Sequence, residues 1–131
     1  STTLFRSVVD LGTVFFVSKA VQAACDLGAL AGVQELDWDL LGLGHVAVRV
    51  DDGERIAVEI ARENLESVEL LVPEVQIGAK VENPPAREDP VITVNAVYTV
   101  RTPFLGSVPG LGRGFQGHVL AEASVVKRTK W

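Results

Sequence analysis

The chain of 131 residues contains one cysteine, two histidines and no methionine, and only 6% of its residues are aromatic. A single cysteine excludes an internal disulfide, a cysteine-based zinc site and a paired-cysteine haem attachment. Acidic residues outnumber basic ones by 17 to 12, and the net charge of −5 leaves no basic excess for nucleic acid or anionic lipid. Because methionine is missing even at position 1, we expect a mature or shortened form from which an N-terminal segment was removed.

Residue types that carry catalysis occur only in patterns that do not assemble a site. His45 and His118 each begin a predicted strand, and neither lies at a metal-binding spacing from a second ligand. The glycine-rich run GLGRG at 110–114 has neither the dinucleotide-binding nor the P-loop spacing, and it precedes a predicted strand instead of a helix. We therefore predict no catalytic residue, no cofactor and no metal, and we do not expect an enzyme.

The single cysteine lies in an alanine-rich part of the N-terminal region. Asp26 follows Cys25, and its negative charge opposes formation of a reactive thiolate. We interpret Cys25 as a small buried hydrophobic side chain, with an intermolecular bridge between neighbouring helices as the alternative.

An apolar run over residues 4–33 contains few helix breakers. Arg6, Asp10, Lys19 and Asp26 interrupt it, and each of these charges would be costly at the centre of a bilayer, which argues against a simple membrane span. The run instead predicts one helix of about 30 residues, roughly 45 Å long.

The polar positions of this helix do not form one continuous stripe. Arg6, Asp10 and Thr13 share one face, whereas Lys19 and Asp26 lie on another. The two halves of the helix therefore face different neighbours. Either a long helix bends across the edge of a domain, or its second half packs on its own head while its first half packs on other subunits. Arg6 and Asp10, four residues apart, are also spaced to pair along the helix.

The rest of the chain predicts an antiparallel sheet with one short helix. Segment 34–44 is a connection, and the alternating valines at 46–50 predict a short strand. Segment 51–64 predicts a helix with Asp51 or Asp52 as its N-cap, and a hairpin through Asp52-Gly53 is the alternative. Further strands are predicted at 75–81, 91–101 and 119–125, separated by a polar loop at 82–90 and a Gly/Pro-rich loop at 103–117. In the second of these strands Ile92, Val94, Ala96, Tyr98 and Val100 share one face.

These elements define the expected organisation. The fold class is α+β: a long N-terminal α-helix followed by a small antiparallel β-sheet head with one short helix. We divide the chain into an N-terminal assembly helix at 1–36 and a globular α+β head at 37–131.

The run VDLGTVFFVSKAVQAACDLGALAGVQEL at 9–36 combines a V-D-L-G start with a helical pattern of the form L-Q-x-A-A-D-A-A-A-L-A-G-A-x-E-L. It resembles the N-terminal signature of TadE/TadG-like (Flp/Tad-type) pilus-assembly proteins, from which Cys25 and Leu27 depart by replacing alanines. Segments 48–67, 91–104 and 119–128 are similar to the later strands and helix of that family. The positions that match the signature are Asp10, Gly12, Gln22, Ala23, Ala24, Asp26, Ala29, Leu30, Ala31, Gly32, Glu35 and Leu36.

The resemblance implies a pilin-like protein that is held in the membrane only as a precursor. We accordingly expect a structural subunit of an extracellular, cell-surface filament that polymerises through its apolar N-terminal helix. Its expected partners are copies of itself and other pilus components, without nucleic acid. The alternative is a minor pilus-assembly component or a cell-surface adhesive module, with surface-loop contacts at Phe104, Leu105 and Phe115. The residues assigned to the assembly helix are Leu4, Phe5, Arg6, Val8, Val9, Asp10, Leu11, Val14, Phe15 and Phe16.

Overall fold

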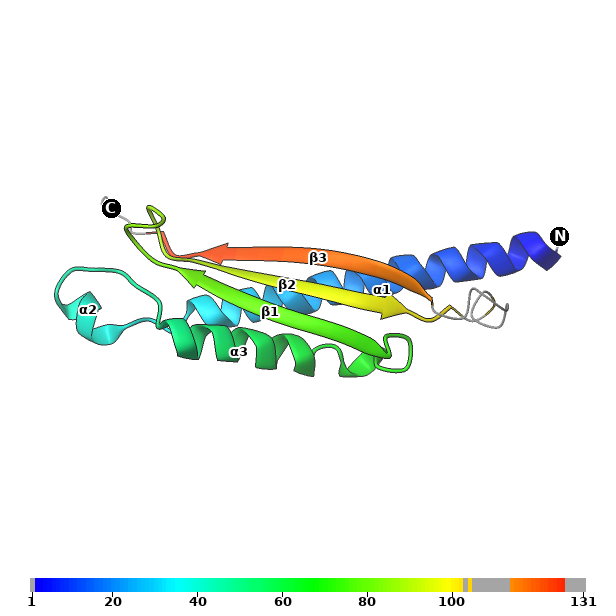
Figure 1. Ribbon diagram of the computed structural model, residues 1–131, viewed down its shortest axis with the longest axis horizontal. Coiled ribbons are helices and arrows are strands. Elements are labelled where there is room, and N and C mark those ends of the chain that lie inside the picture. The colour runs from blue at the N-terminus through cyan, green and yellow to red at the C-terminus, as the bar shows by residue number, and fades with distance from the viewer. Residues whose placement is uncertain (1, 103, 105–113, 127–131) are drawn as a thin grey trace.

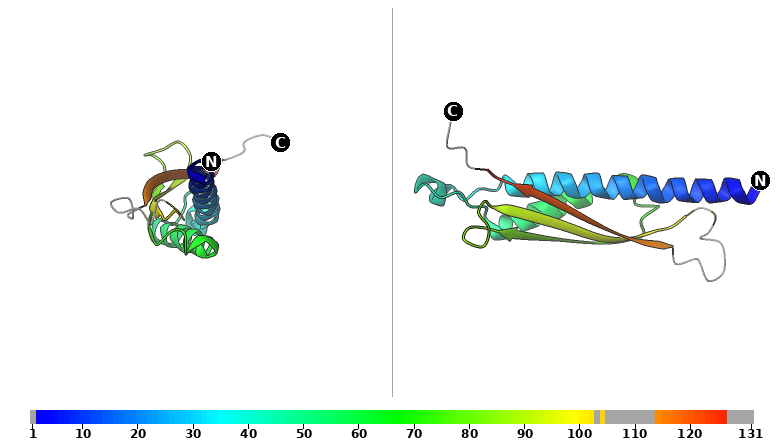
Figure 2. Two further views of the ribbon diagram at one scale, coloured as in Figure 1. Left: turned by 90° about the vertical axis from the view of Figure 1, so that its right-hand side faces the viewer. Right: turned by 90° about the horizontal axis from the view of Figure 1, so that it is seen from above.

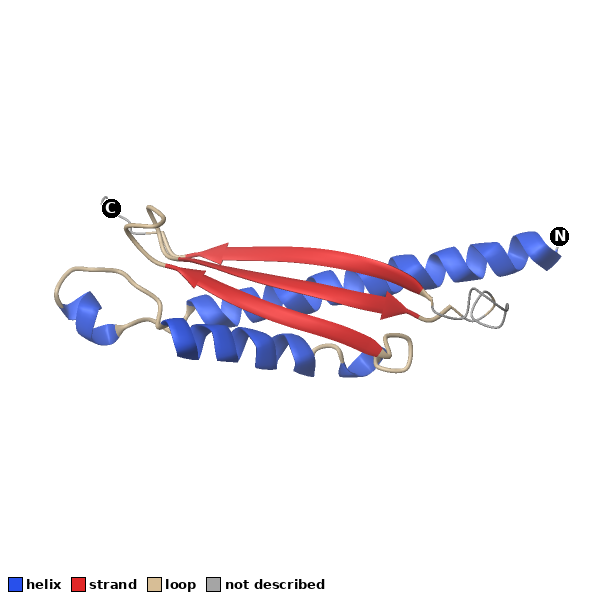
Figure 3. Ribbon diagram, viewed as in Figure 1, coloured by secondary structure: helices blue, strands red, loops and turns tan. Residues whose placement is uncertain are grey.

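The computed structural model describes residues 2–102, 104 and 114–126 and confirms the α+β class. A long helix and a shorter one form one layer, and a three-stranded sheet forms the other (Figure 1, Figure 3). The elements in chain order are α1 (Thr2–Val33), α2 (Trp38–Gly42), α3 (Val50–Glu63), the 3-10 turn η1 (Glu66–Val68), β1 (Glu74–Glu82), β2 (Val91–Val100) and β3 (Phe115–Ser124).

The sheet is antiparallel with strand order β1-β2-β3. Its central strand carries the face predicted from sequence, because its alternate residues from Ile92 to Val100 are at most 5% exposed. Both α1 and α3 cover this face, α1 against β2 and β3 and α3 against β1 (Figure 2). The core therefore lies between one face of the sheet and the two helices.

Small residues let α1 and α3 approach closely. A Cβ atom added to Gly28 would lie 2.5 Å from the carbonyl oxygen of Ala57, and one added to Gly32 would lie 2.6 Å from the carbonyl oxygen of Gly53. Any larger residue at either glycine would push the helices apart. This close contact fixes the second half of α1 to the head.

Each outer strand of the sheet is bound at one point by a helix side chain. The Val81 amide of β1 donates to Oε2 of Glu54 on α3, at 2.9 Å. The Leu120 carbonyl of β3 accepts a hydrogen bond from Nε2 of Gln22 on α1, at 3.3 Å. Because unpaired strand edges invite pairing with other chains, these contacts occupy backbone groups that would otherwise be open.

The strand predicted at 46–50 is wrong. Val48 forms only an isolated bridge with Leu36, and Val50 is already the first residue of α3. The side chain of Asn83 takes both backbone groups of Val48: its Oδ1 accepts from the amide and its Nδ2 donates to the carbonyl, each at 2.8 Å. An amide side chain thus occupies the place of a partner strand. His45, expected to begin this strand, is instead an exposed residue before the bridge.

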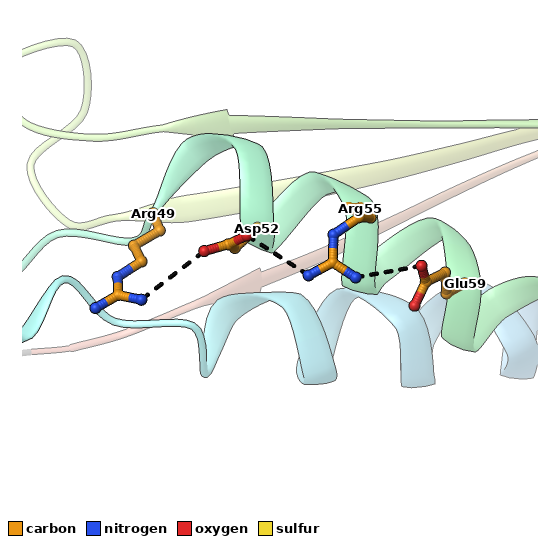
Figure 4. A network of polar contacts seen from close by, with 4 residues as sticks. All are labelled: Arg49, Asp52, Arg55 and Glu59. Atoms are coloured by element: carbon orange, nitrogen blue, oxygen red, sulfur yellow. Dashed lines mark hydrogen bonds and ion pairs between the residues drawn. The ribbon is translucent and has the colours of Figure 1, made fainter.

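Segment 51–64 is helical, so the hairpin alternative is wrong. The N-cap is Arg49 and neither predicted aspartate, since Asp51 and Asp52 lie in the first turn of α3, where their charges favour the helix dipole. Asp52 contacts Arg49 at 3.8 Å and Arg55 at 3.5 Å, and Arg55 contacts Glu59 at 3.2 Å (Figure 4). Hydrogen bonding to Glu59 is the main cause of a raised pKa at Arg55. These pairs are solvent-exposed and contribute little to stability.

Strand β3 begins at Phe115, four residues before its predicted start, so His118 lies inside the strand. The register continues from Val91↔Ser124 to Val100↔Phe115. Gly117 made the segment look like a loop, but it lies opposite Tyr98, whose ring occupies the space of a Cβ. The glycine is therefore a packing requirement within a strand.

Candidate assembly surface

Helix α1 has two halves with opposite surroundings. Its second half belongs to the hydrophobic core. The core therefore contains side chains from both the proposed assembly helix (1–36) and the proposed head (37–131). Its first turns extend past the end of the sheet, at the opposite end of the molecule from α2 (Figure 1, Figure 2). We call residues 2–16 the stem. The core residues of the second half are Val17, Val21, Ala24, Cys25, Ala29 and Val33, all at most 4% exposed.

One side of the stem consists of large apolar side chains open to solvent. Positions 4, 8, 11 and 15 follow the helical repeat and form a continuous stripe, which positions 5 and 16 widen. We call these six residues the stem face. They are Leu4, Phe5, Val8, Leu11, Phe15 and Phe16, and each is 58–71% exposed.

Two of the hydroxyl groups on the stem are bonded within the helix itself. Oγ of Ser7 donates to the carbonyl of Thr3 at 3.0 Å, and Oγ1 of Thr13 donates to the carbonyl of Val9 at 2.9 Å. Their bonding capacity is thereby used locally. These positions can lie in an apolar contact at lower cost than free hydroxyls.

The predicted polar face of the stem turns toward its own chain. Asp10 is 3% exposed, and its Oδ1 accepts a hydrogen bond from the Phe104 amide at 3.0 Å. The Arg6 guanidinium lies 5.6 Å from the centre of the Phe104 ring, a cation–π contact. Asp10 is therefore placed for attachment to the head and not for contact with other subunits, and Phe104 is half-buried against the stem. Val9 and Val14 are half-buried as well.

The candidate loop contacts and the assembly helix meet in one place. A groove of about 370 Å³ is lined by Ser7, Asp10, Leu11, Val14 and Phe115. Phe115 is 45% exposed at the start of β3, so it borders the stem and does not stand on a separate loop. Leu105 lies outside the described residues. Phe104 and Phe115 thus extend the stem surface instead of forming a second one.

The cysteine offers no chemistry at this surface. Cys25 is fully buried, and this burial, with the charge of Asp26 second, raises the pKa of its thiol to about 11. The intermolecular bridge considered from sequence is therefore wrong, because the sulfur cannot reach another chain. Within the described residues, no group of three His, Cys, Asp or Glu side chains could hold a metal ion.

The sequence prediction missed a second exposed apolar cluster. Trp38, Leu40 and Leu43 are 63%, 38% and 74% exposed; the first two lie in the short helix α2, and Leu43 is its C-cap. The sequence does contain a signal for this short helix, because Asp37 is a good N-cap residue and stands immediately before an apolar-rich turn. It was masked by the two glycines that made the segment look like a simple connection.

Length and composition alone would let α1 cross a membrane. A mostly buried core helix passes the same test, but only 28% of the apolar window of α1 is buried, and its second half alone packs in the core. The role of the stem must therefore be argued from its exposure, spacing and charge. No family model, curated protein or solved structure matches the chain.

Proposed function

We propose that the chain is a structural subunit of an extracellular pilus-like filament that polymerises through the stem face. The observation that carries this proposal is the contrast within α1, whose second half is buried in its own head while six large side chains of its first half are exposed. An apolar surface of this size on one helix is typical of an interaction site. Neighbouring copies of the chain would cover it.

The free energy gained by burying the stem face supports self-association. Complete burial of a large apolar side chain contributes roughly 1.5–3 kcal/mol, so covering the exposed parts of six contributes on the order of 6–12 kcal/mol. That is comparable to the whole stability of a typical domain. Association itself costs about 4–15 kcal/mol, so one pairwise contact would be weak. A partner surface that is itself apolar, or contact with several neighbours in a filament, would make the association favourable.

The sequence resemblance to TadE/TadG-like proteins supports the same assignment. It is strongest over 9–36, which contains the end of the stem and the small residues that fix α1 to the head. A membrane-held precursor and a position on the cell surface are part of this proposal. The mixed arrangement, with a packed head and an exposed helix, is what a subunit needs to stay folded while it assembles.

The test compares two charge insertions. Purified wild-type chain should form polymers visible by electron microscopy and by sedimentation, whereas Val8→Asp/Leu11→Asp should remain a monomer with unchanged far-UV circular dichroism. Leu70→Asp is the matched control, because Leu70 is 92% exposed on the head and receives the same change. It should polymerise like the wild type.

Two results would contradict the proposal. A wild-type chain that is monodisperse and monomeric shows that the stem face needs no cover from copies. Flotation of the wild-type chain with lipid vesicles, combined with no polymer in their absence, shows that lipid covers the stem instead.

A further inference from the structure

Opposite the stem, the molecule ends in a second apolar cluster of defined shape. We call residues 37–43, which carry the exposed Trp38, Leu40 and Leu43, the tip. The tip and the N-terminus lie at the two ends of the long axis (Figure 1). Large aromatic and aliphatic side chains exposed at such a position are typical anchors of protein interfaces.

The tip is held in one conformation by its own hydrogen bonds. Oδ1 of Asp37 accepts from the amides of Asp39 and Leu40 at 3.1 and 3.2 Å, which caps α2. The His45 amide donates to the Leu40 carbonyl, and the Asp37 amide donates to the Ala47 carbonyl, both at 2.9 Å. A surface fixed before binding loses less conformational entropy when a partner docks.

Acidic side chains accompany the apolar ones. A groove of about 370 Å³ beside the tip is lined by Leu40, His45, Glu88 and Asp89, among others. Asp39 is exposed at the start of α2. The tip therefore combines apolar contact area with negative charge.

The N-terminal part of α1, which carries the stem, has the opposite charge. Among the described residues 2–24, the exposed charged side chains are Arg6 and Lys19, both basic, while Asp10 is buried. The Lys19 ammonium lies 5.4 Å from the centre of the Phe15 ring, so positive charge borders the stem face directly. Opposite charges beside two apolar surfaces favour their association and fix its direction.

We propose that the tip of one copy docks on the stem of the next, so that subunits join head to tail. This inference rests on the proposed function and names the surface that the stem binds. Trp38 and Leu43 would pack on the stem face, and Lys19, which borders that face, would approach Glu88 and Asp89. Because the two surfaces differ and lie at opposite ends, the growing assembly always keeps one free stem and one free tip, and growth does not close.

Mixing two defective chains tests this arrangement. The tip variant Trp38→Ser/Leu43→Ser keeps an intact stem, and the stem variant Val8→Asp/Leu11→Asp keeps an intact tip. Each alone should be monomeric by analytical ultracentrifugation, with association at least about 30-fold weaker than in the wild type, as expected when an aromatic anchor is lost. A 1:1 mixture should give a heterodimer that does not grow further. Leu70→Ser, the matched control at an exposed leucine outside both surfaces, should polymerise normally.

A charge exchange gives a second, milder test. Lys19→Glu and Asp89→Lys should each weaken polymerisation about tenfold at low salt, and the double variant should recover most of the loss. Because both side chains reach solvent, neither change is expected to disturb the core.

The outcomes separate this inference from the proposed function. Polymerisation of the tip variant at the wild-type level overturns tip docking, and it leaves stem-driven assembly standing. Absence of the heterodimer in the mixture, or an exchange variant as weak as its single variants, also overturns tip docking. A monomeric wild-type chain rejects the proposed function, and this inference with it.

Discussion

Replacing Gly28 by alanine should destabilise the chain although alanine is the better helix former. A Cβ at this position would lie 2.5 Å from the carbonyl oxygen of Ala57 and 3.2 Å from the Cβ of Ala61. The nearer atom belongs to the backbone of α3, so only a shift of the whole helix relieves it. Such overpacking costs about 1–3 kcal/mol, and a rigid backbone contact belongs at the upper end of that range. After a gain of about 1 kcal/mol in helix propensity, a net loss of about 2 kcal/mol is expected.

Gly12→Ala is the matched comparison on the same helix. Among the described residues, a Cβ at Gly12 would meet nothing within 4 Å, so the substitution keeps only the propensity gain of up to about 1 kcal/mol. The difference between the two variants, about 3 kcal/mol, therefore isolates the cost of separating α1 from α3. Urea unfolding followed by far-UV circular dichroism measures it. Both changes are best made in the Val8→Asp/Leu11→Asp background, which keeps assembly out of the equilibrium.

Equal stability of Gly28→Ala and Gly12→Ala would contradict this expectation, because the helices would then not be in close contact. A further variant tests which atom causes the loss. Ala61→Gly removes only the longer contact, so Gly28→Ala/Ala61→Gly should stay destabilised. Full recovery in that double variant would assign the clash to a side chain and contradict the backbone argument.

Three other predictions concern substitutions at buried or half-buried side chains. The raised pKa of Cys25, about 11, means that the unfolded chain loses the thiol proton first, so the free energy of unfolding should fall by about 2–3 kcal/mol from pH 9 to pH 11. Cys25→Ala should remove that decrease in urea titrations, and equal curves for both chains would contradict it. Glu54→Leu leaves the Val81 amide without its acceptor and should cost about 1–3 kcal/mol in urea unfolding, whereas Glu54→Gln keeps an acceptor and should cost less. Asn83→Leu removes both bonds to Val48 and should speed exchange of the Val48 amide hydrogen, and protection as in the wild type would refute this.

Strong periodicity made part of the fold predictable from sequence. The uninterrupted run of α1 and the alternation of β2 both agree with the structure, because in each case local preference and burial point the same way. Alternation misled at 46–50, where Asn83 binds Val48 in place of a strand. A side chain 35 residues away decides that local structure, and no local pattern reports it.

The candidate site was predictable in outline. The shift of the polar stripe between Asp10 and Lys19 correctly indicated two environments along one helix. The prediction placed Asp10 with the outward-facing residues because spacing alone cannot tell which polar face meets the rest of the chain. That depends on Phe104, which returns to the stem from 94 residues away. The tip was missed for a similar reason, since its exposure is a property of the folded chain.

Side-chain size explains where along α1 the two environments meet. Gly28 and Gly32 permit the close approach to α3 that holds the second half of the helix in the core. The stem carries leucine and phenylalanine on its exposed side, and a Cβ added to Gly12 would meet no other described residue within 4 Å. Helices that touch through glycine cannot continue the same contact through such large side chains. The stem is therefore attached to its own head through Asp10, on a different side of the helix from its apolar stripe, so the stem face stays 58–71% exposed and available to the partner that we propose.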